Sequence, residues 1–250
     1  MSYQSALSHV LSSTIEPSAQ LIAAHERFPR ASVVALGEAG LLGLTVSVHF
    51  GGGGLGLAEA AEVVTAVSRA CPAAGAVLRS HYAAVACIEA YGTPWLRQKV
   101  ATGCHLSTLA VADAWNSDPA GGAASPAGST ALRTGDVVTL RARKCDVVAA
   151  GEADSYIWSS PPVDDGGSAL WVISADAPGL FVPARPNGTG PRGSSTSTVC
   201  ADPVRVPASA RLGQESSEGT EMLHTALQWL AALPVAGSVT PGQVGGEVLT

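Results

Sequence analysis

The apolar residues of this 250-residue chain change their spacing near residue 106. Before that point they recur at helical spacing, and Gly or Pro separates one segment from the next. After it, short β-branched or aromatic runs bounded by turn residues occur at residues 137–140, 156–158, 170–173 and 204–206. Because the apolar period falls from about 3.6 to about 2, we expect an α+β fold. The prediction is an α-helical domain over residues 1–106, followed by a small antiparallel sheet or barrel over residues 107–213.

A last helical pattern runs from residue 221 to residue 233, with Met222, Trp229 and Leu230 on one face and Pro234 as its stop. Residues 214–250 are therefore predicted to be a single helix and a flexible tail. Aromatic and methionine side chains are enriched in interface cores. This face predicts a homo-oligomer or a partner chain.

Composition excludes several classes of partner. The chain is 46% hydrophobic and 14% charged with a formal net charge of -6, which argues against nucleic acid. No apolar run approaches the roughly 18 residues of a membrane span, and residues 1–20 lack a basic start followed by an apolar stretch, so we expect no membrane and a cytoplasmic location. The five cysteines are scattered without a C-x-x-C pair, which predicts core residues and no metal site.

Two segments resemble the flavin-binding signatures of the acyl-CoA dehydrogenase family. Residues 109–118 are similar to V-T-E-P-x-A-G-S-D, and residues 141–154 to N-G-x-K-x-W-I-T-N-G-x-x-A-D. Weaker matches to other segments of that family follow in the right order at residues 28–29, 37–44, 49–52, 92–99, 177–180, 190–194 and 202–207. The resemblance implies a helical N-terminal domain and a sheet domain with FAD as the family cofactor. It also implies a third, four-helix domain that we expect this chain to lack.

Gly51, Gly53 and Gly56 also fit the dinucleotide spacing G-x-G-x-x-G. A dinucleotide site needs a βαβ unit and an acidic residue about 20 positions further on, and residues 71–80 hold no Asp or Glu. We therefore favour a glycine turn between two helices.

The resemblance places flavin-ring contacts at Ala112 and Val148, and an aromatic residue near Asp146. All three family residues are replaced in this chain. Alanine and valine side chains carry no hydrogen-bonding group, so we expect no cofactor. If FAD is retained, Ser117 and Arg192 are the predicted cofactor-binding residues.

The family's catalytic glutamate has no counterpart, since the expected position reads Leu227-Gln228-Trp229-Leu230. The predicted catalytic residues are instead Asp113, Asp146 and His81. Lys144 more simply ties down a turn, and His105 is a further candidate for proton transfer. The ligand pocket is predicted at Tyr82, Ala83, Ala112, Trp115, Ser117 and Val148.

Three functions remain open from the sequence. The favoured one is a repurposed protein that binds a hydrophobic acyl or polyketide-like ligand in the cleft between the domains. It would promote a non-redox cyclisation, elimination or isomerisation in specialised metabolism. The second is an FAD-dependent acyl-CoA dehydrogenase subunit (α,β-desaturation) acting with a full-length acyl-CoA dehydrogenase partner. The third is a non-catalytic binding or scaffold protein.

Overall fold

The computed structural model describes residues 2–113, 115–116, 125–126, 128–163, 167–183, 188–213 and 218–234. The helical part comprises α1 (Tyr3–Val10), η1 (Leu11–Ile15), α2 (Glu16–His25), α3 (Arg30–Glu38), η2 (Val48–Phe50), α4 (Leu57–Ala70), α5 (Pro72–Tyr91) and α6 (Pro94–Ala101). The described residues from 2 to 106 hold no strand. The predicted helical first part is confirmed.

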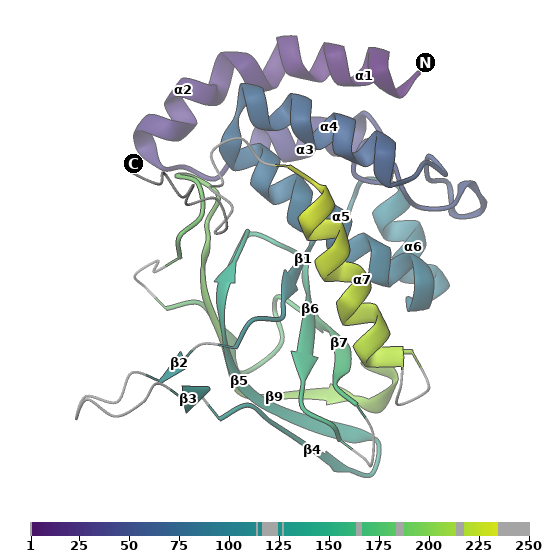
Figure 1. Cartoon of the computed structure of the whole chain (residues 1–250), viewed down its shortest axis with the longest axis vertical. Helices are drawn as coiled ribbons and strands as arrows, with labels where there is room; N and C mark the ends of the chain where they lie inside the picture. Colours follow the sequence, from purple (N-terminus) through teal and green to yellow (C-terminus); the bar gives the residue numbers. More distant parts are fainter. Residues whose placement is uncertain are drawn as a thin grey trace, which may run out of the picture.

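Strands make up most of the second part. They are β1 (Ser107–Ala110), β2 (Trp115–Asn116), β3 (Ser125–Pro126), β4 (Thr130–Thr134), β5 (Val137–Val147), β6 (Ser155–Ser160), β7 (Ala169–Ser174), β8 (Leu180–Phe181), β9 (Ser197–Pro207) and β10 (Arg211–Leu212), with η3 (Ala208–Ala210) before β10. Helix α7 (Glu218–Ala232) follows. Figure 1 shows the helices gathered at one end of the molecule and the strands at the other, with α7 running alongside both.

Local sequence signals mark where α4, α5 and α6 begin. The Glu59 carboxylate accepts the Gly56 backbone N–H at 2.9 Å at the start of α4. Pro72 occupies the first turn of α5, where its missing N–H costs nothing. The Thr93 hydroxyl accepts the Leu96 N–H at 3.3 Å and caps α6.

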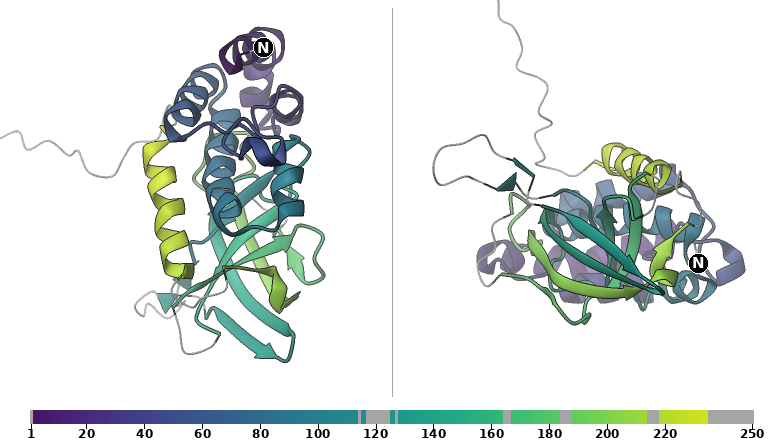
Figure 2. Two further views of the ribbon diagram at one scale, coloured as in Figure 1. Left: turned by 90° about the vertical axis from the view of Figure 1, so that its right-hand side faces the viewer. Right: turned by 90° about the horizontal axis from the view of Figure 1, so that it is seen from below.

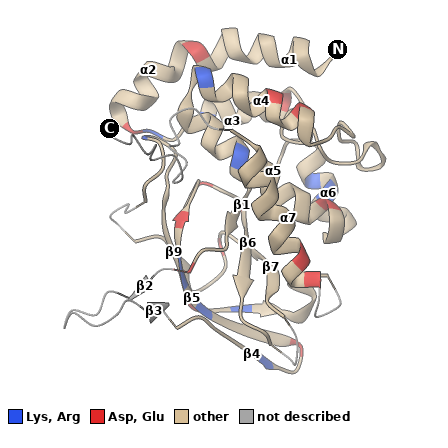
Figure 3. Cartoon of the chain, viewed as in Figure 1, with Lys and Arg blue, Asp and Glu red and all other residues tan. Residues whose placement is uncertain are grey.

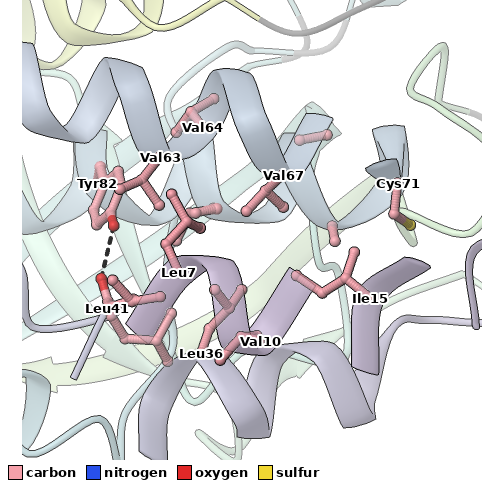
Figure 4. Close-up of a cluster of buried hydrophobic side chains, with 14 of the residues drawn as sticks. Leu7, Val10, Ile15, Leu36, Leu41, Val63, Val64, Val67, Cys71 and Tyr82 are labelled. Carbon is pink, nitrogen blue, oxygen red and sulfur yellow. Dashed lines mark hydrogen bonds between the residues drawn. The ribbon is translucent and has the colours of Figure 1, made fainter. Parts of the chain in front are cut away.

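The helical part has a continuous apolar core, shown in Figure 4. Leu7, Val10 and Ile15 from the first helices pack there against Val63 and Val67 of α4. The core excludes water from residues that are far apart in sequence, which is the main source of its stability.

The strands form two four-stranded sheets, in the orders β1-β6-β7-β10 and β4-β5-β9-β8, and a short β2-β3 pair. Apolar side chains of β5, β6, β7 and β9 share one core between the sheets, including Leu140, Trp158, Trp171 and Val204. The pairs are antiparallel as predicted, except that β1 pairs with β6 in parallel. This exception is possible because β4 and β5 lie between these strands in the chain and provide the long connection that a parallel pair requires.

Helix α7 packs on α5 and β7, on the outer side of the molecule (Figure 2). Met222 and Ala226 are buried in the core that α7 shares with α5, and Trp229 packs partly buried against the same core. The face that the sequence assigned to an intermolecular contact is thus used within the chain. Self-association stays a prediction. The large apolar side chain of α7 that is exposed in the described structure is Leu227, at 48% exposure.

The glycine-rich segment after η2 is a turn leading into α4, as the family resemblance implied. Gly51 has φ +90°, a conformation that side chains with a Cβ rarely adopt. With no βαβ unit among the described residues of this region, the dinucleotide alternative is wrong.

Charged residues are sparse and scattered in Figure 3, without one large cluster of a single sign. None of the helices in the described part of the chain combines the length and the hydropathy needed to cross a bilayer.

Candidate functional site

A cavity of about 620 Å³ lies where α5, α7 and the ends of β1 and β5 meet. Its wall is mainly apolar, with one cation and one carboxylate. The lining residues are Pro72, Ala76, Arg79, Ser80, Leu109, Val111, Ala112, Cys145, Asp146, Val148, Thr189, Gly190, Pro191, Thr196, Leu227 and Leu230. This size and character are typical of a small-molecule site. We call it the interdomain cavity.

Asp146 lies at the wall of the interdomain cavity in a left-handed backbone conformation, with φ +51°. Its Oδ1 accepts hydrogen bonds from the backbone N–H and the hydroxyl of Thr189, both at 3.0 Å. These two bonds hold the carboxylate in place, while the residue remains exposed. A positioned carboxylate beside an apolar space can accept a proton from a bound ligand.

Arg79 is the cation of the cavity wall and is half-buried on α5. Its Nε donates to the carbonyl oxygen of Leu230 at 2.8 Å, and Nη2 donates to the same oxygen. Burial lowers the pKa of the Arg79 guanidinium below its usual value. No motif identifies this residue, although it is the one charged side chain between residues 73 and 88 of a mainly apolar helix.

Ala112 and Val148 both line the interdomain cavity, as the sequence predicted. The Val148 carbonyl accepts the Thr108 hydroxyl at 2.8 Å, and the Ser80 hydroxyl is paired with the same threonine at 2.8 Å. The hydroxyl of Thr196 is paired with that of Ser194 at 2.6 Å. These side-chain groups of the wall are therefore already used within the protein.

The side chains of the cavity wall can be compared with what the flavin implied by the resemblance would need. The polar edge of a flavin ring needs hydrogen-bond partners, because a buried polar group without one is costly. Ala112 and Val148 offer none from their side chains, and Asp146 places a carboxylate where the family has an aromatic residue. The side chains at these three positions therefore offer a flavin ring fewer hydrogen-bond partners and ring contacts than the resemblance implies.

Asp113 and Lys144 form an ion pair beside the cavity without lining it. Lys144 Nζ lies 2.7 Å from Asp113 Oδ1 and donates to the Ser159 hydroxyl at 2.9 Å. Burial lowers the pKa of Lys144, and the hydrogen bond with Asp113 partly opposes that shift. Both residues therefore fasten the segment after β1 to β5, which is the structural role expected for Lys144. Asp113, predicted to be catalytic, does not line the interdomain cavity.

His81, Tyr82 and Ala83 lie outside the interdomain cavity, in contrast to the sequence prediction. His81 Nδ1 accepts the Ser107 N–H at 3.2 Å, and its Nε2 donates to the Leu42 carbonyl oxygen at 3.1 Å. Burial lowers the pKa of His81 to about 4. The Tyr82 hydroxyl donates to the Leu41 carbonyl oxygen at 2.7 Å, drawn as a dashed line in Figure 4. Because these side chains face the core, they are structural.

The remaining predicted residues are Trp115, Ser117 and Arg192. Trp115 is placed only as part of the short strand β2. Ser117 lies outside the described residues. Arg192 is exposed, does not line the cavity, and its Nε lies 3.5 Å from Glu26 Oε1.

In the part of the chain that the structure describes, neither the cysteines nor other His, Asp and Glu side chains cluster as metal ligands. Cys71, Cys87 and Cys200 are buried, as predicted for core residues, whereas Cys104 is exposed. Among the residues placed by the structure, no three His, Cys, Asp or Glu side chains gather as metal ligands. His105 Nε2 lies 2.8 Å from the Ser155 hydroxyl, in a smaller cavity of about 290 Å³.

Comparisons with known proteins agree with this architecture. Residues 2–104 match the family model of the acyl-CoA dehydrogenase N-terminal domain. The probable acyl-CoA dehydrogenase YngJ of Bacillus subtilis is 28% identical over 222 residues, which cover 84% of this chain and 57% of that protein. The chain thus spans about half the length of the curated relatives that it matches.

Solved structures extend the likeness through the sheet domain. The crystal structure of a probable acyl-CoA dehydrogenase from Mycobacterium abscessus is 26% identical, with a TM-score of 0.75 over 91% of this chain and 61% of that one. FkbI, described as acting in biosynthesis of a methoxymalonyl extender unit, shares the fold at 24% identity, with a TM-score of 0.73 over 92% of this chain and 63% of its own. The family model, the curated relatives and the shared fold together support the acyl-CoA dehydrogenase family for this chain: residues 2–104 match its N-terminal domain, and the described structure shares its fold through the sheet domain.

Proposed function

We propose that this chain binds a hydrophobic acyl or polyketide-like ligand in the interdomain cavity and promotes a non-redox rearrangement of it. One observation carries this proposal: the cavity keeps a ligand-sized apolar space, while the side chains at the flavin-contact positions, Ala112 and Val148, have no hydrogen-bonding groups. The space suits an acyl chain better than a flavin ring.

The proposed chemistry uses residues of this chain alone. The apolar wall, including Leu109, Leu227 and Leu230, would hold the acyl chain in one conformation and exclude water. Asp146 would accept a proton from an acidic carbon next to the ligand's carbonyl group and return it to another carbon of the same ligand. Such an isomerisation or cyclisation is balanced without an external oxidant or reductant.

The alternative is the redox activity named for the relatives, with a second chain completing the site. Purification of the full chain and an absorption spectrum would separate the two. The proposal predicts no flavin absorbance, and saturable binding of an uncharged medium-chain acyl amide such as octanamide. Stoichiometric flavin retained through purification, or no saturable binding of octanamide and octanoate, would contradict it.

A further inference from the structure

We infer that Arg79 recognises a carboxylate on the ligand of the interdomain cavity, so that the ligand is an anionic acyl compound. This inference rests on the proposed function, because it assigns the ligand class of the same cavity. It is carried by the position of the guanidinium on a mainly apolar wall, where no described acidic side chain forms an ion pair with it.

Among the residues that the structure places, no acidic side chain pairs with Arg79. Among the described residues it forms no ion pair, and its hydrogen bonds go to the backbone carbonyl of Leu230. Asp146 lines the same cavity. Burial lowers the pKa of Arg79, and Asp146 does not raise it. Burying an unpaired cation is costly, so an anion at this position would stabilise the guanidinium.

The hydrogen-bonding capacity of Arg79 is only partly used. A guanidinium has five N–H donors in a planar fork, and the contacts with Leu230 use those of Nε and Nη2 on one side. A carboxylate matches the geometry of the remaining donors better than a neutral carbonyl group does.

The rest of the cavity wall agrees with a ligand that combines an anionic group and an apolar chain. Pro72, Ala76, Leu109, Val111 and Leu227 provide apolar surface around Arg79. The other charged group of the wall, Asp146, has Oδ1 occupied by Thr189 and would repel a second carboxylate. The ligand carboxylate is therefore expected at the α5 side of the cavity, next to Arg79.

The test compares octanoate with octanamide by calorimetric titration of the 250-residue protein. The two ligands have the same hydrocarbon chain but differ in charge. The expected preference for octanoate is about 10- to 100-fold in Kd, the range for a charge-assisted hydrogen bond. Arg79→Met should abolish this preference. Arg97→Met is the matched control, because Arg97 also donates to backbone carbonyls, those of Ile88 and Ala90, but lies away from the cavity.

Arg79→Gln is a second variant, in case Arg79→Met does not fold. Its side-chain amide can still donate to the Leu230 carbonyl oxygen, but the charge is lost. Equal affinity of the wild-type protein for both ligands would overturn the inference and leave acyl binding intact. A preference for octanoate that survives in a folded Arg79→Gln variant would overturn it as well. Binding of neither ligand would refute the proposed function and this inference together.

Discussion

Lys144 Nζ lies 2.7 Å from Oδ1 of Asp113, and the lysine side chain is fully buried while the aspartate side chain is 33% exposed. The two residues also face each other across an isolated β-bridge that joins the segment after β1 to β5. The Cys145 N–H donates to the Ala112 carbonyl oxygen at 2.9 Å in the same connection. The ion pair therefore fixes the two backbone segments that carry Ala112 and Asp146 to the cavity.

The unequal burial of this pair predicts unequal effects of removing either partner. Asp113→Asn leaves a charged lysine buried without its counter-ion and should lower the free energy of unfolding by about 3 kcal/mol. Lys144→Met removes the buried charge and leaves an aspartate that water can reach, so we expect a smaller loss, about 1 kcal/mol. Urea denaturation at pH 7 measures both, and a larger loss in Lys144→Met would contradict the argument.

The same ion pair predicts that the free energy of unfolding depends on pH in the alkaline range. Burial depresses the pKa of Lys144 in the folded protein, so the folded state binds fewer protons than the unfolded state as pH approaches the unfolded pKa. The contribution of this lysine to stability therefore rises with pH in that window. Asp113→Asn removes the partner that supports the charge, so its stability deficit relative to wild type should shrink between pH 7 and pH 10.

His81 predicts a loss of stability in mild acid. Its folded-state pKa is about 4, below the unfolded value of about 6.5, so the unfolded state alone takes up a proton between these values. Stability attributable to His81 is fully present above about pH 6.5 and is lost as pH falls to about 4. The loss amounts to about 3 kcal/mol.

Urea denaturation from pH 7 to pH 4 tests this expectation. His81→Gln should have a flatter pH profile than the wild-type protein, although it is less stable at pH 7. His25→Gln, at the exposed end of α2, is the matched control. Parallel profiles of the wild type and His81→Gln would show that the buried histidine is not the titrating group.

Much of the fold was readable from local patterns. The alternating burial along β5 and the largely apolar helix α5 (Pro72–Tyr91) follow directly from side-chain spacing. The parallel pairing of β1 with β6 was missed because it joins segments about 50 residues apart, which local spacing does not encode. His81 was assigned to the site because it lies on the helix expected to line the ligand pocket, and its partners, Ser107 and Leu42, are brought to it only by tertiary contacts.

The residues that line the cavity were only partly predictable, because some belong to sequence motifs and others reach the cavity through tertiary packing. Ala112, Asp146 and Val148 were placed by their positions in the motifs, and all three line the cavity. Arg79 and Thr189 belong to no motif, and they reach the cavity only through the packing of α5 and of residues 188–196 around it. Tertiary contacts, not sequence spacing, bring them there.

Restoring hydroxyl groups at the motif positions should increase affinity for FAD only modestly. Ala112→Thr with Val148→Thr adds up to two hydrogen bonds, each worth about 1 kcal/mol, so the combined gain is at most about 30-fold in Kd. Fluorescence titration with FAD measures it. Val137→Thr makes the same chemical change on an exposed strand position away from the cavity and should leave the titration unchanged.

Gly219, at the start of α7, sets how closely that helix approaches the sheet. The residue is buried, and a Cβ added there would overlap the backbone carbonyl oxygen of Ser168, just before β7. In an exposed helix, replacing glycine with alanine stabilises by about 1 kcal/mol. Here the overlap with rigid backbone outweighs that gain, so Gly219→Ala should lower the stability of the protein.

The same substitution should also weaken ligand binding, because α7 carries Leu227 and Leu230 to the cavity and accepts the Arg79 hydrogen bonds at Leu230. Displacing the helix start separates these groups from α5. Thr220→Ala, at the neighbouring exposed position, is the matched control and should change neither property by much. Chemical denaturation and titration with octanoate measure the two effects. A Gly219→Ala protein that is more stable than wild type, with unchanged affinity, would show that α7 does not depend on this close approach.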